Sequence, residues 1–320
     1  MAAALTVKVV VPEPIAEPGL ALLREAGFTV VELTPAAAAS GELAGALADA
    51  QALIVRSAVK VNAGLLAAAP QLRVVGRAGV GVDNVDLAAA KARGVVVMNT
   101  PGGSSAAVAE LTLGMMLALA RHLPRAAAGM RAGQWEKKAL EGTELLGKTL
   151  GLLGFGRIAI EVARRARAFG MTVIAYDPAT PLQAARQSGV ELVDFDQVLA
   201  RSDYLSLHLA LSATAHNLLD SAAFARMKPG IRLINCARGE VIDETALEAA
   251  LRSGRVAAAA LDVFQQEPPG ASSLLQLPNL IATPHLGAAT VEAQERVGVA
   301  IAEQIRDYLL HGRLANAVSV

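Results

Sequence analysis

Short runs of Val, Ile and Leu alternate with Ala-rich stretches of helical length, and this alternation constrains the fold more than any other feature of the chain. The runs are almost wholly apolar, which is typical of parallel strands covered on both faces. Gly27 and Gly94 stand where glycines commonly end helices. The pattern therefore predicts repeated β-α units and an α/β fold with two doubly wound parallel sheets.

Two series of β-α units are expected, separated by turn-forming residues. The first has strands at 7–11, 29–33, 52–56, 73–76 and 95–98, with helices at 19–26, 41–50, 63–68 and 87–93. A turn-rich segment at 99–105 precedes a long helix at 106–121, which continues past Pro124 to about residue 132. The second series has strands at 149–153, 172–176, 192–193, 204–207, 231–235, 258–261 and 280–282, before a last helix at 290–310.

Composition narrows the class of protein. Hydrophobic residues make up 53% of the 320 residues and charged residues 18%, so the chain can bury large cores and is not disordered as a whole. Basic and acidic residues balance at 29 each, so no basic excess predicts nucleic-acid binding. The single cysteine, Cys236, excludes an intrachain disulfide framework and a CxxC zinc site, and no other metal motif is present.

No segment predicts secretion or membrane insertion. The N-terminus has no basic stretch ahead of an apolar segment, which a signal peptide requires. The longest apolar run, residues 111–120, is interrupted by Thr112 and is about half of the roughly 20 residues that a membrane span needs. A cytoplasmic protein is expected.

A glycine-spaced turn, Gly154-Phe-Gly156-Arg-Ile-Ala159, follows one predicted strand and opens a helix. It matches the G-x-G-x-x-G/A pattern, in which glycines allow a tight turn and let the backbone approach a pyrophosphate. The helix start presents backbone N–H groups to that anion, and Arg157 adds a positive charge. On its own the motif is also compatible with a purely structural turn.

Asp177 ends the next predicted strand, 21 residues after Gly156. A carboxylate there accepts hydrogen bonds from a ribose 2′-hydroxyl and repels a 2′-phosphate, which favours NAD over NADP. The alternative is that Asp177 caps the turn before Pro178. The order of strand, loop, helix and acid predicts a dinucleotide site.

Three further polar residues follow predicted parallel strands. Arg238 lies just after strand 231–235, Glu267 after 258–261 and His285 after 280–282. Ligands of open α/β sheets bind at this edge. Histidine suits proton transfer near neutrality, a carboxylate orients the imidazole, and arginine binds a substrate carboxylate bidentately. Together they predict the oxidation of a hydroxy acid by hydride transfer.

Each of these residues also has a simpler interpretation. His285 fits a turn after Pro284, Glu267 a solvated loop and Arg238 a local ion pair with Glu240. Cys236 is expected to pack rather than react. Surface or core roles are expected for the remaining histidines, which are His122, His208, His216 and His311.

The motifs together resemble the D-isomer-specific 2-hydroxyacid dehydrogenases over nearly the whole chain. Those that carry the resemblance are the glycine turn with Asp177, Asn235-Cys-Ala-Arg-Gly239, Asp262-Val-Phe-Gln-Gln-Glu267-Pro and Pro284-His-Leu-Gly-Ala288. Within the family, further stretches resemble the D-3-phosphoglycerate dehydrogenases, notably Val55-Arg-Ser57, Gly76-Arg-Ala-Gly-Val-Gly-Val-Asp-Asn84, Asn99-Thr-Pro-Gly-Gly103 and Gly133-Gln-Trp-Glu-Lys-Lys138.

The resemblance implies roles for individual residues. Arg238 would hold the substrate carboxylate, His285 would be the acid–base residue and Glu267 its partner. The substrate site would also include Arg56, for the phosphate, with Ser57, Ala78, Gly79 and Val80. The NAD contacts implied are Val80, Gly154, Gly156, Arg157, Ile158, Asp177, Leu209, Cys236, Ala237, Arg238, Asp262, His285, Leu286, Gly287 and Ala288. Leu209 departs from the polar residue common in relatives, so only its backbone or apolar surface can contribute.

The family's organisation implies a Rossmann-type NAD-binding domain at 100–285 inserted into a flavodoxin-like substrate-binding domain formed by 1–99 and 286–320, with the site between them. It also implies a homodimer through residues 106–146, with Trp135 and Lys137 reaching the partner's site; packing in the interface is the alternative for both.

The implied activity is oxidation of 3-phospho-D-glycerate at C2 by NAD, giving 3-phosphohydroxypyruvate for serine biosynthesis. A hydroxypyruvate or glyoxylate reductase, or another D-2-hydroxyacid dehydrogenase, would use the same three residues. An NAD-sensing, corepressor-like interaction protein is the alternative from another class. The sequence continues only briefly past residues 316–318, without the serine-binding extension of many relatives. Both a short form without feedback inhibition and a truncated chain fit this ending.

Overall fold

The computed structural model describes residues 7–39, 41–212 and 214–318, and these divide into two compact units. Unit 1 comprises Met1–Ser104 with Ala288–Val320, and unit 2 is Ser105–Gly287. The first six residues, which were not expected to form a signal peptide, lie outside the described residues. Each unit is built around one all-parallel sheet, so the prediction of two doubly wound parallel sheets is confirmed.

Unit 1 has a five-stranded sheet in the order β2-β1-β3-β4-β5. The order in which strands are added to the sheet reverses between β1 and β3, because β1 pairs in parallel with β2 on one side and with β3 on the other. The strands are β1 (Lys8–Val11), β2 (Thr29–Glu32), β3 (Ala52–Val55), β4 (Val74–Arg77) and β5 (Val96–Met98). The helices are α1 (Glu17–Glu25), α2 (Pro35–Ala39), α3 (Glu42–Leu47), α4 (Ala63–Ala67), α5 (Leu87–Ala92) and α13 (Val291–His311).

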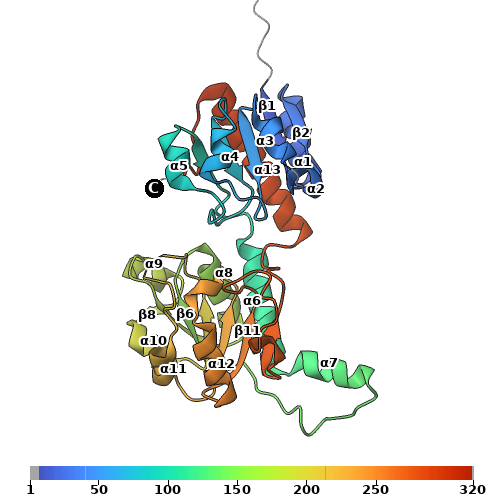
Figure 1. Cartoon of the computed structure of the whole chain (residues 1–320). Helices are drawn as coiled ribbons and strands as arrows, with labels where there is room; N and C mark the ends of the chain where they lie inside the picture. Colours follow the sequence, from blue (N-terminus) through green and yellow to red (C-terminus); the bar gives the residue numbers. More distant parts are fainter. Residues whose placement is uncertain (1–6, 40, 213, 319–320) are drawn as a thin grey trace, which may run out of the picture. The chain divides into compact units, whose positions relative to one another are not determined.

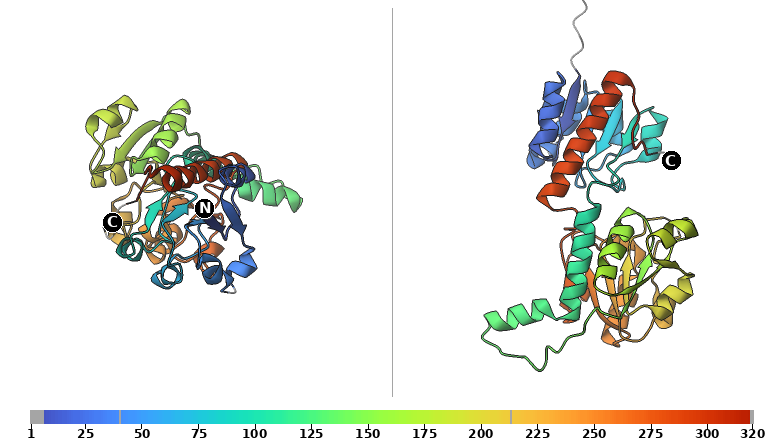
Figure 2. Two further views of the ribbon diagram at one scale, coloured as in Figure 1. Left: turned by 90° about the horizontal axis from the view of Figure 1, so that it is seen from above. Right: turned by 180° about the vertical axis from the view of Figure 1, so that it is seen from behind.

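Helices cover both faces of this sheet because the strands are apolar on both sides. Alternate strand residues pack against α1 and α13 on one face, and their neighbours pack against α3, α4 and α5 on the other. Figure 2 shows α13, in red, lying along the sheet of unit 1. The last helix of the chain therefore returns to complete the core of the first unit.

Unit 2 has a seven-stranded sheet in the order β12-β11-β10-β9-β6-β7-β8, labelled in part in Figure 1. The strands are β6 (Thr149–Leu153), β7 (Thr172–Tyr176), β8 (Glu191–Leu192), β9 (Tyr204–Leu207), β10 (Ile231–Asn235), β11 (Val256–Leu261) and β12 (Leu280–Ala282). The helices are α6 (Ser105–Ala120), α7 (Leu123–Arg131), α8 (Arg157–Ala168), α9 (Leu182–Gln187), α10 (Phe195–Arg201), α11 (Ser221–Arg226) and α12 (Glu244–Arg252), with short 3-10 turns at Gly239–Val241 and Leu274–Gln276.

The two faces of this sheet carry separate cores. Helices α6, α8 and α9 cover one face, while α10, α11 and α12 cover the other. The switch in strand order falls between β6 and β9, since the chain runs outward from β6 to β8 and then returns to β9. Open α/β sheets bind ligands beside such a switch, at the carboxyl ends of the strands.

One predicted helix differs from the structure. The expected continuous stretch 106–132 is divided into α6 and α7, which are bent by 65° at the break. His122 there has φ 53° and Pro124 follows, so the backbone cannot continue as one helix. Helix α7 projects from the body of unit 2 (Figure 1). Among the described residues no single helix is long and apolar enough to cross a membrane; only this bent pair meets that criterion jointly.

Candidate active site

The glycine turn lies at the switch point of the sheet in unit 2. Gly154 has φ 88°, and a Cβ there would come within 2.7 Å of the His208 carbonyl oxygen, so only glycine fits. Gly156 differs, because a Cβ there would meet nothing within 4 Å. It is the N-cap of α8 and brings no side-chain acceptor to the first-turn N–H groups. This open helix start, with Arg157 exposed beside it, suits the pyrophosphate of a dinucleotide.

Asp177 follows β7 and is tied to the glycine turn. Its Oδ2 accepts a hydrogen bond from the Phe155 N–H at 2.7 Å, and its Oδ1 accepts from the Ala179 and Thr180 N–H groups at 2.8 and 3.2 Å. Asp177 thus caps the turn that follows it and also fixes the turn after β6. A half-buried carboxylate at this strand end still has lone pairs for a ribose hydroxyl, so the residues present fit NAD.

His208, at the end of β9, also contributes to the switch point. The backbone N–H of His208 donates to the Leu153 carbonyl at 2.7 Å, and its ring Nε2 lies 3.0 Å from Ser206 Oγ. Burial lowers the pKa of His208 from 6.5 to about 3, so the imidazole is neutral. Sequence reasoning gave His208 no part in the site. The signal that would have found it is a histidine directly after the strand that pairs with the strand before the phosphate loop.

Arg238, Glu267 and His285 follow β10, β11 and β12, which are adjacent parallel strands. Their loops therefore leave the same edge of the sheet. The backbone of Arg238 is extended, with φ −141° and ψ 134°. Its carbonyl accepts from Asn235 Nδ2 at 2.8 Å, while Asn235 Oδ1 accepts from the Ala237 N–H at 3.0 Å. Asn235 is fully buried and fixes the loop that carries Arg238, a role that sequence reasoning missed.

The Arg238 loop packs directly against the Glu267 loop. A Cβ at Gly239 would lie 1.9 Å from the Phe264 carbonyl carbon, so glycine is required for this approach. The Phe264 N–H donates to Glu267 Oε1 at 3.2 Å, which orients the carboxylate. The second oxygen, Oε2, lies 2.8 Å from His285 Nδ1. The structure thus brings the expected histidine–carboxylate pair together, with both side chains exposed.

Asp262 holds the backbone on either side of the histidine. Its side chain is 1% exposed, and it accepts from the Leu286 N–H at 2.7 Å, the Gly287 N–H at 2.8 Å and Thr283 Oγ1 at 2.5 Å. His285 itself has φ 54°, a conformation that few residues other than glycine adopt. The buried carboxylate supports this turn, which aims the imidazole at Glu267.

The other expected contacts in unit 2 are partly covered. Cys236 Sγ is buried 3.6 Å from Met115 Sδ, and burial raises the pKa of the thiol to about 12, so it packs and does not act as a nucleophile. Leu209 is half-buried, and its Cδ2 lies 3.1 Å from where a Gly154 Cβ would be. Ala237 and Ile158 are half-buried too. Within residues 7–39, 41–212 and 214–318, no group of three His, Cys, Asp or Glu residues could hold a metal ion.

Unit 1 holds the remaining expected substrate residues. Gly79 and Val80 follow β4, and their carbonyls accept from the Thr100 N–H at 2.9 Å and Asn99 Nδ2 at 2.6 Å. Arg56 and Ser57 follow β3. Ala78 is buried in the core of the unit, and Ala288 is half-buried ahead of α13.

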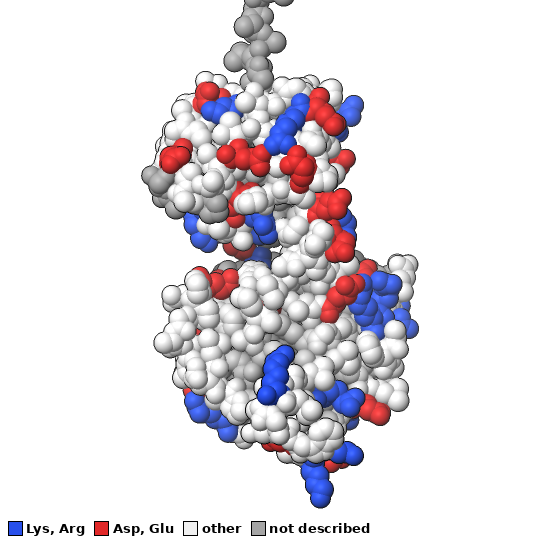
Figure 3. Space-filling view, turned by 90° about the vertical axis from the view of Figure 1, so that its right-hand side faces the viewer, with Lys and Arg blue, Asp and Glu red and all other residues white. Residues whose placement is uncertain are grey.

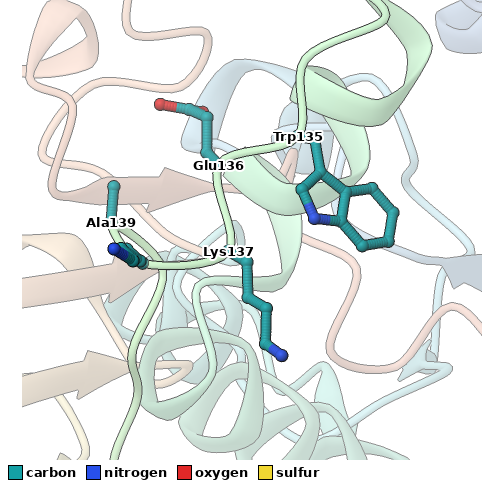
Figure 4. A pocket seen from close by; sticks show the side chains of 5 residues that line it. Trp135, Glu136, Lys137 and Ala139 are labelled. Carbon is teal, nitrogen blue, oxygen red and sulfur yellow. The ribbon is translucent and has the colours of Figure 1, made fainter.

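The segment after α7 carries Trp135 and Lys137. Trp135 is 78% exposed, and both residues line a small surface hollow with Glu136, Lys138 and Ala139. Figure 4 shows the Trp135 and Lys137 side chains leaving the extended segment on a different side from Glu136. Figure 3 shows acidic and basic side chains interspersed over one face, with wide uncharged areas on unit 2.

Comparisons with known proteins agree with this geometry. The D-isomer specific 2-hydroxyacid dehydrogenase, NAD binding domain family matches residues 113–287. A D-3-phosphoglycerate dehydrogenase from Methanocaldococcus jannaschii is 46% identical over 98% of this chain and 59% of its own length. A hydroxypyruvate reductase from Thermotoga maritima is 49% identical over 86% of this chain and 90% of its own length.

Solved structures give the same result. The TT0316 protein from Thermus thermophilus has a TM-score of 0.88 and 37% identity over 98% of this chain and 100% of its own. A D-lactate dehydrogenase from Aquifex aeolicus, complexed with NAD and lactic acid, has a TM-score of 0.85 and 27% identity over 98% and 99%. The chain spans about three-fifths of the length of the D-3-phosphoglycerate dehydrogenases that it matches. It belongs to the D-isomer-specific 2-hydroxyacid dehydrogenases, with the family's NAD-binding domain in residues 113–287.

Proposed function

We propose that this chain is an NAD-dependent dehydrogenase that oxidises 3-phospho-D-glycerate at C2 to 3-phosphohydroxypyruvate, the first step of serine biosynthesis. The observation that carries the proposal is the 2.8 Å pair of His285 and Glu267, set beside the Arg238 loop at one sheet edge. The 46% identity to a D-3-phosphoglycerate dehydrogenase over 98% of this chain supports the choice of substrate.

The three side chains divide the chemistry. The Arg238 guanidinium binds the substrate carboxylate bidentately and sets C2 in place. The His285 Nδ1–H donates to Glu267, which leaves Nε2 to take the proton of the C2 hydroxyl as the carbonyl forms. Glu267 then stabilises the imidazolium. NAD, when bound, supplies the acceptor for the hydride that leaves C2.

Other residues would position the cofactor and the substrate. Gly156 and the start of α8 would hold the pyrophosphate, and Asp177 the ribose. We assign substrate binding to unit 1, where the backbone of 78–80 would hold the carboxylate with Arg238, and Arg56 and Ser57 the phosphate.

We further propose that the enzyme is a cytoplasmic homodimer joined through residues 106–146. The support is the exposed apolar surface of this region, where Leu123, Met130 and Trp135 are 52, 58 and 78% exposed. Large apolar side chains gathered on one exposed segment often mark a protein–protein interface. Trp135 and Lys137 would contact the substrate site of the partner.

The test is a comparison of substrates on one enzyme preparation. NADH absorbance is followed with 3-phospho-D-glycerate and, in parallel, with phosphate-free D-glycerate. The proposal predicts a much higher kcat/KM for the phosphorylated acid. Equal or better turnover of D-glycerate would favour a hydroxypyruvate reductase, and tight peptide binding without turnover would indicate an NAD-sensing interaction protein.

The second candidate function is reduction of hydroxypyruvate. It is favoured by the 49% identity to the Thermotoga maritima hydroxypyruvate reductase, of which this chain covers 90%. The same three side chains serve the reverse direction, with His285 donating the proton. The two substrates differ in the phosphate, which Arg56 would bind. Arg56→Ala should therefore raise the KM for the phosphorylated acid and leave the KM for the unphosphorylated acid unchanged.

A further inference from the structure

The carboxyl ends of β1 and β3 diverge at the switch point of the sheet in unit 1. The loop after β1 contains Glu13 and Pro14, and the loop after β3 comprises residues 56–60. Between them lies a cavity of about 670 Å³, whose lining includes Glu13, Arg56 and Lys60. A switch point in a doubly wound sheet is where such folds bind ligands.

Glu13 holds the second of these loops by four hydrogen bonds. Its Oε2 accepts from the N–H groups of Arg56 at 2.8 Å and Val59 at 3.2 Å. Its Oε1 accepts from those of Ser57 at 3.1 Å and Ala58 at 2.9 Å. Four consecutive N–H groups therefore converge on one carboxylate, and hydrogen bonds to an ionised acceptor are stronger than neutral ones.

The same loop is held from its carbonyl side. Asn84, which is 8% exposed, donates through Nδ2 to the carbonyls of Arg56 at 3.0 Å and Val59 at 2.8 Å. The Arg56 guanidinium contacts the Pro14 carbonyl through Nη1 at 3.4 Å. The Glu13 oxygens thus accept hydrogen bonds from backbone N–H groups. The Arg56 guanidinium contacts the uncharged Pro14 carbonyl.

We infer that Glu13 is a positioning residue for the substrate phosphate: its carboxylate fixes residues 56–59 so that Arg56 and Ser57 present their donors to that group. The inference rests on the proposed function. It is not obvious from charge, because an acid beside a phosphate site opposes phosphate binding through space. The geometry predicts that Glu13 instead favours phosphate binding, since its carboxylate holds the loop that carries the donors.

Glu13→Gln separates these two effects. The glutamine can accept hydrogen bonds at only one of its two terminal atoms, and its amide group faces N–H donors at the other. We expect the KM for 3-phospho-D-glycerate to rise roughly tenfold, with kcat and the KM for NAD little changed. A fall in that KM would mean that Glu13 acts only as a repelling charge, which overturns the inference.

Two comparisons exclude a merely structural effect. Glu13→Asp keeps the carboxylate and should recover part of the lost affinity, whereas Glu17→Gln, which removes an exposed partner of Arg24, should leave the KM unchanged. In an Arg56→Ala background, Glu13→Gln should raise the KM by less than it does in the unaltered enzyme, because only its effect through Ser57 remains. Additive effects of the two substitutions would overturn the inference.

The outcomes distinguish this inference from the proposed function. If the unaltered enzyme fails to oxidise 3-phospho-D-glycerate, the proposed function is wrong and the role of Glu13 is wrong with it. If the enzyme is active and Glu13→Gln leaves the KM unchanged, the role of Glu13 alone is wrong. Thermal unfolding of each variant is recorded to detect a loss of stability. An unchanged kcat shows that the residues around the reacting carbon keep their positions.

Discussion

His285 Nδ1 lies 2.8 Å from Glu267 Oε2, although the two residues follow different strands and are separated by 18 positions. The pairing depends on neighbours that are not themselves reactive. Asp262 anchors the backbone after His285, and the Phe264 N–H orients the Glu267 carboxylate. A histidine with one nitrogen on a carboxylate has the other available for proton transfer.

The two glycines of the phosphate turn should respond differently to alanine. Gly154→Ala introduces a Cβ at φ 88° and 2.7 Å from the His208 carbonyl oxygen, so we expect a loss of about 1–2 kcal/mol in the free energy of unfolding. Gly156→Ala places its Cβ in open space and should leave stability unchanged, while the NAD dissociation constant rises roughly tenfold. Urea unfolding and NAD titration measure both; equal behaviour of the two variants would contradict this assignment.

Asp177 is expected to set the preference for NAD. Asp177→Ala removes the charge that repels a 2′-phosphate and also the cap on the Phe155 N–H, so the ratio of kcat/KM for NAD to that for NADP should narrow and NAD affinity should fall. Asp196→Ala, which removes a surface partner of Arg226, is the control. An unchanged NAD-to-NADP ratio in Asp177→Ala would show that another residue sets the preference.

His208 should make the stability of the protein depend on pH. Its pKa is about 3 in the folded protein and 6.5 ordinarily, so below pH 6.5 the unfolded chain binds a proton that the folded chain does not. The stabilisation is present above pH 6.5 and is lost as pH falls, by on the order of 1 kcal/mol at pH 5.5.

Urea unfolding at pH 8 and pH 5.5 tests the assignment to His208. The variant His208→Gln should lose less stability between the two values than the unaltered protein, whereas His311→Gln, exposed at the end of α13, should behave like the unaltered protein. The same pH-dependent loss in His208→Gln would assign the effect to another group.

The apolar surface around α7 should support the dimer. Leu123→Glu combined with Met130→Glu places charges where the partner is expected, so sedimentation should shift from dimer to monomer. Leu182→Glu is the matched control, because Leu182 is 61% exposed on α9, outside this region. A monomeric unaltered protein, or a double variant that remains dimeric, would refute the proposed interface.

The fold was largely predictable because the strands are short apolar runs that periodicity identifies. The features that the sequence does not predict depend on the backbone angles of single residues or on contacts between residues far apart in the chain. The bend at His122 depends on a positive φ that no composition rule requires. Helix α2 is not predicted, because its five residues, one proline and four alanines, are too few to show an apolar periodicity. For the site, strand ends indicated Arg238, Glu267 and His285, whereas Glu13 contacts a loop 43 residues away and has no sequence signature.

The role of His285 in proton transfer is tested by the turnover of His285→Ala. NADH formation from 3-phospho-D-glycerate is compared among the unaltered enzyme, His285→Ala, Glu267→Gln and the control His311→Ala, with NAD binding measured on each. We expect His285→Ala to lose at least about 100-fold in kcat while its NAD affinity changes little, and Glu267→Gln to fall between it and the control. Turnover by His285→Ala at the rate of the unaltered enzyme would show that this imidazole does not take the substrate's proton.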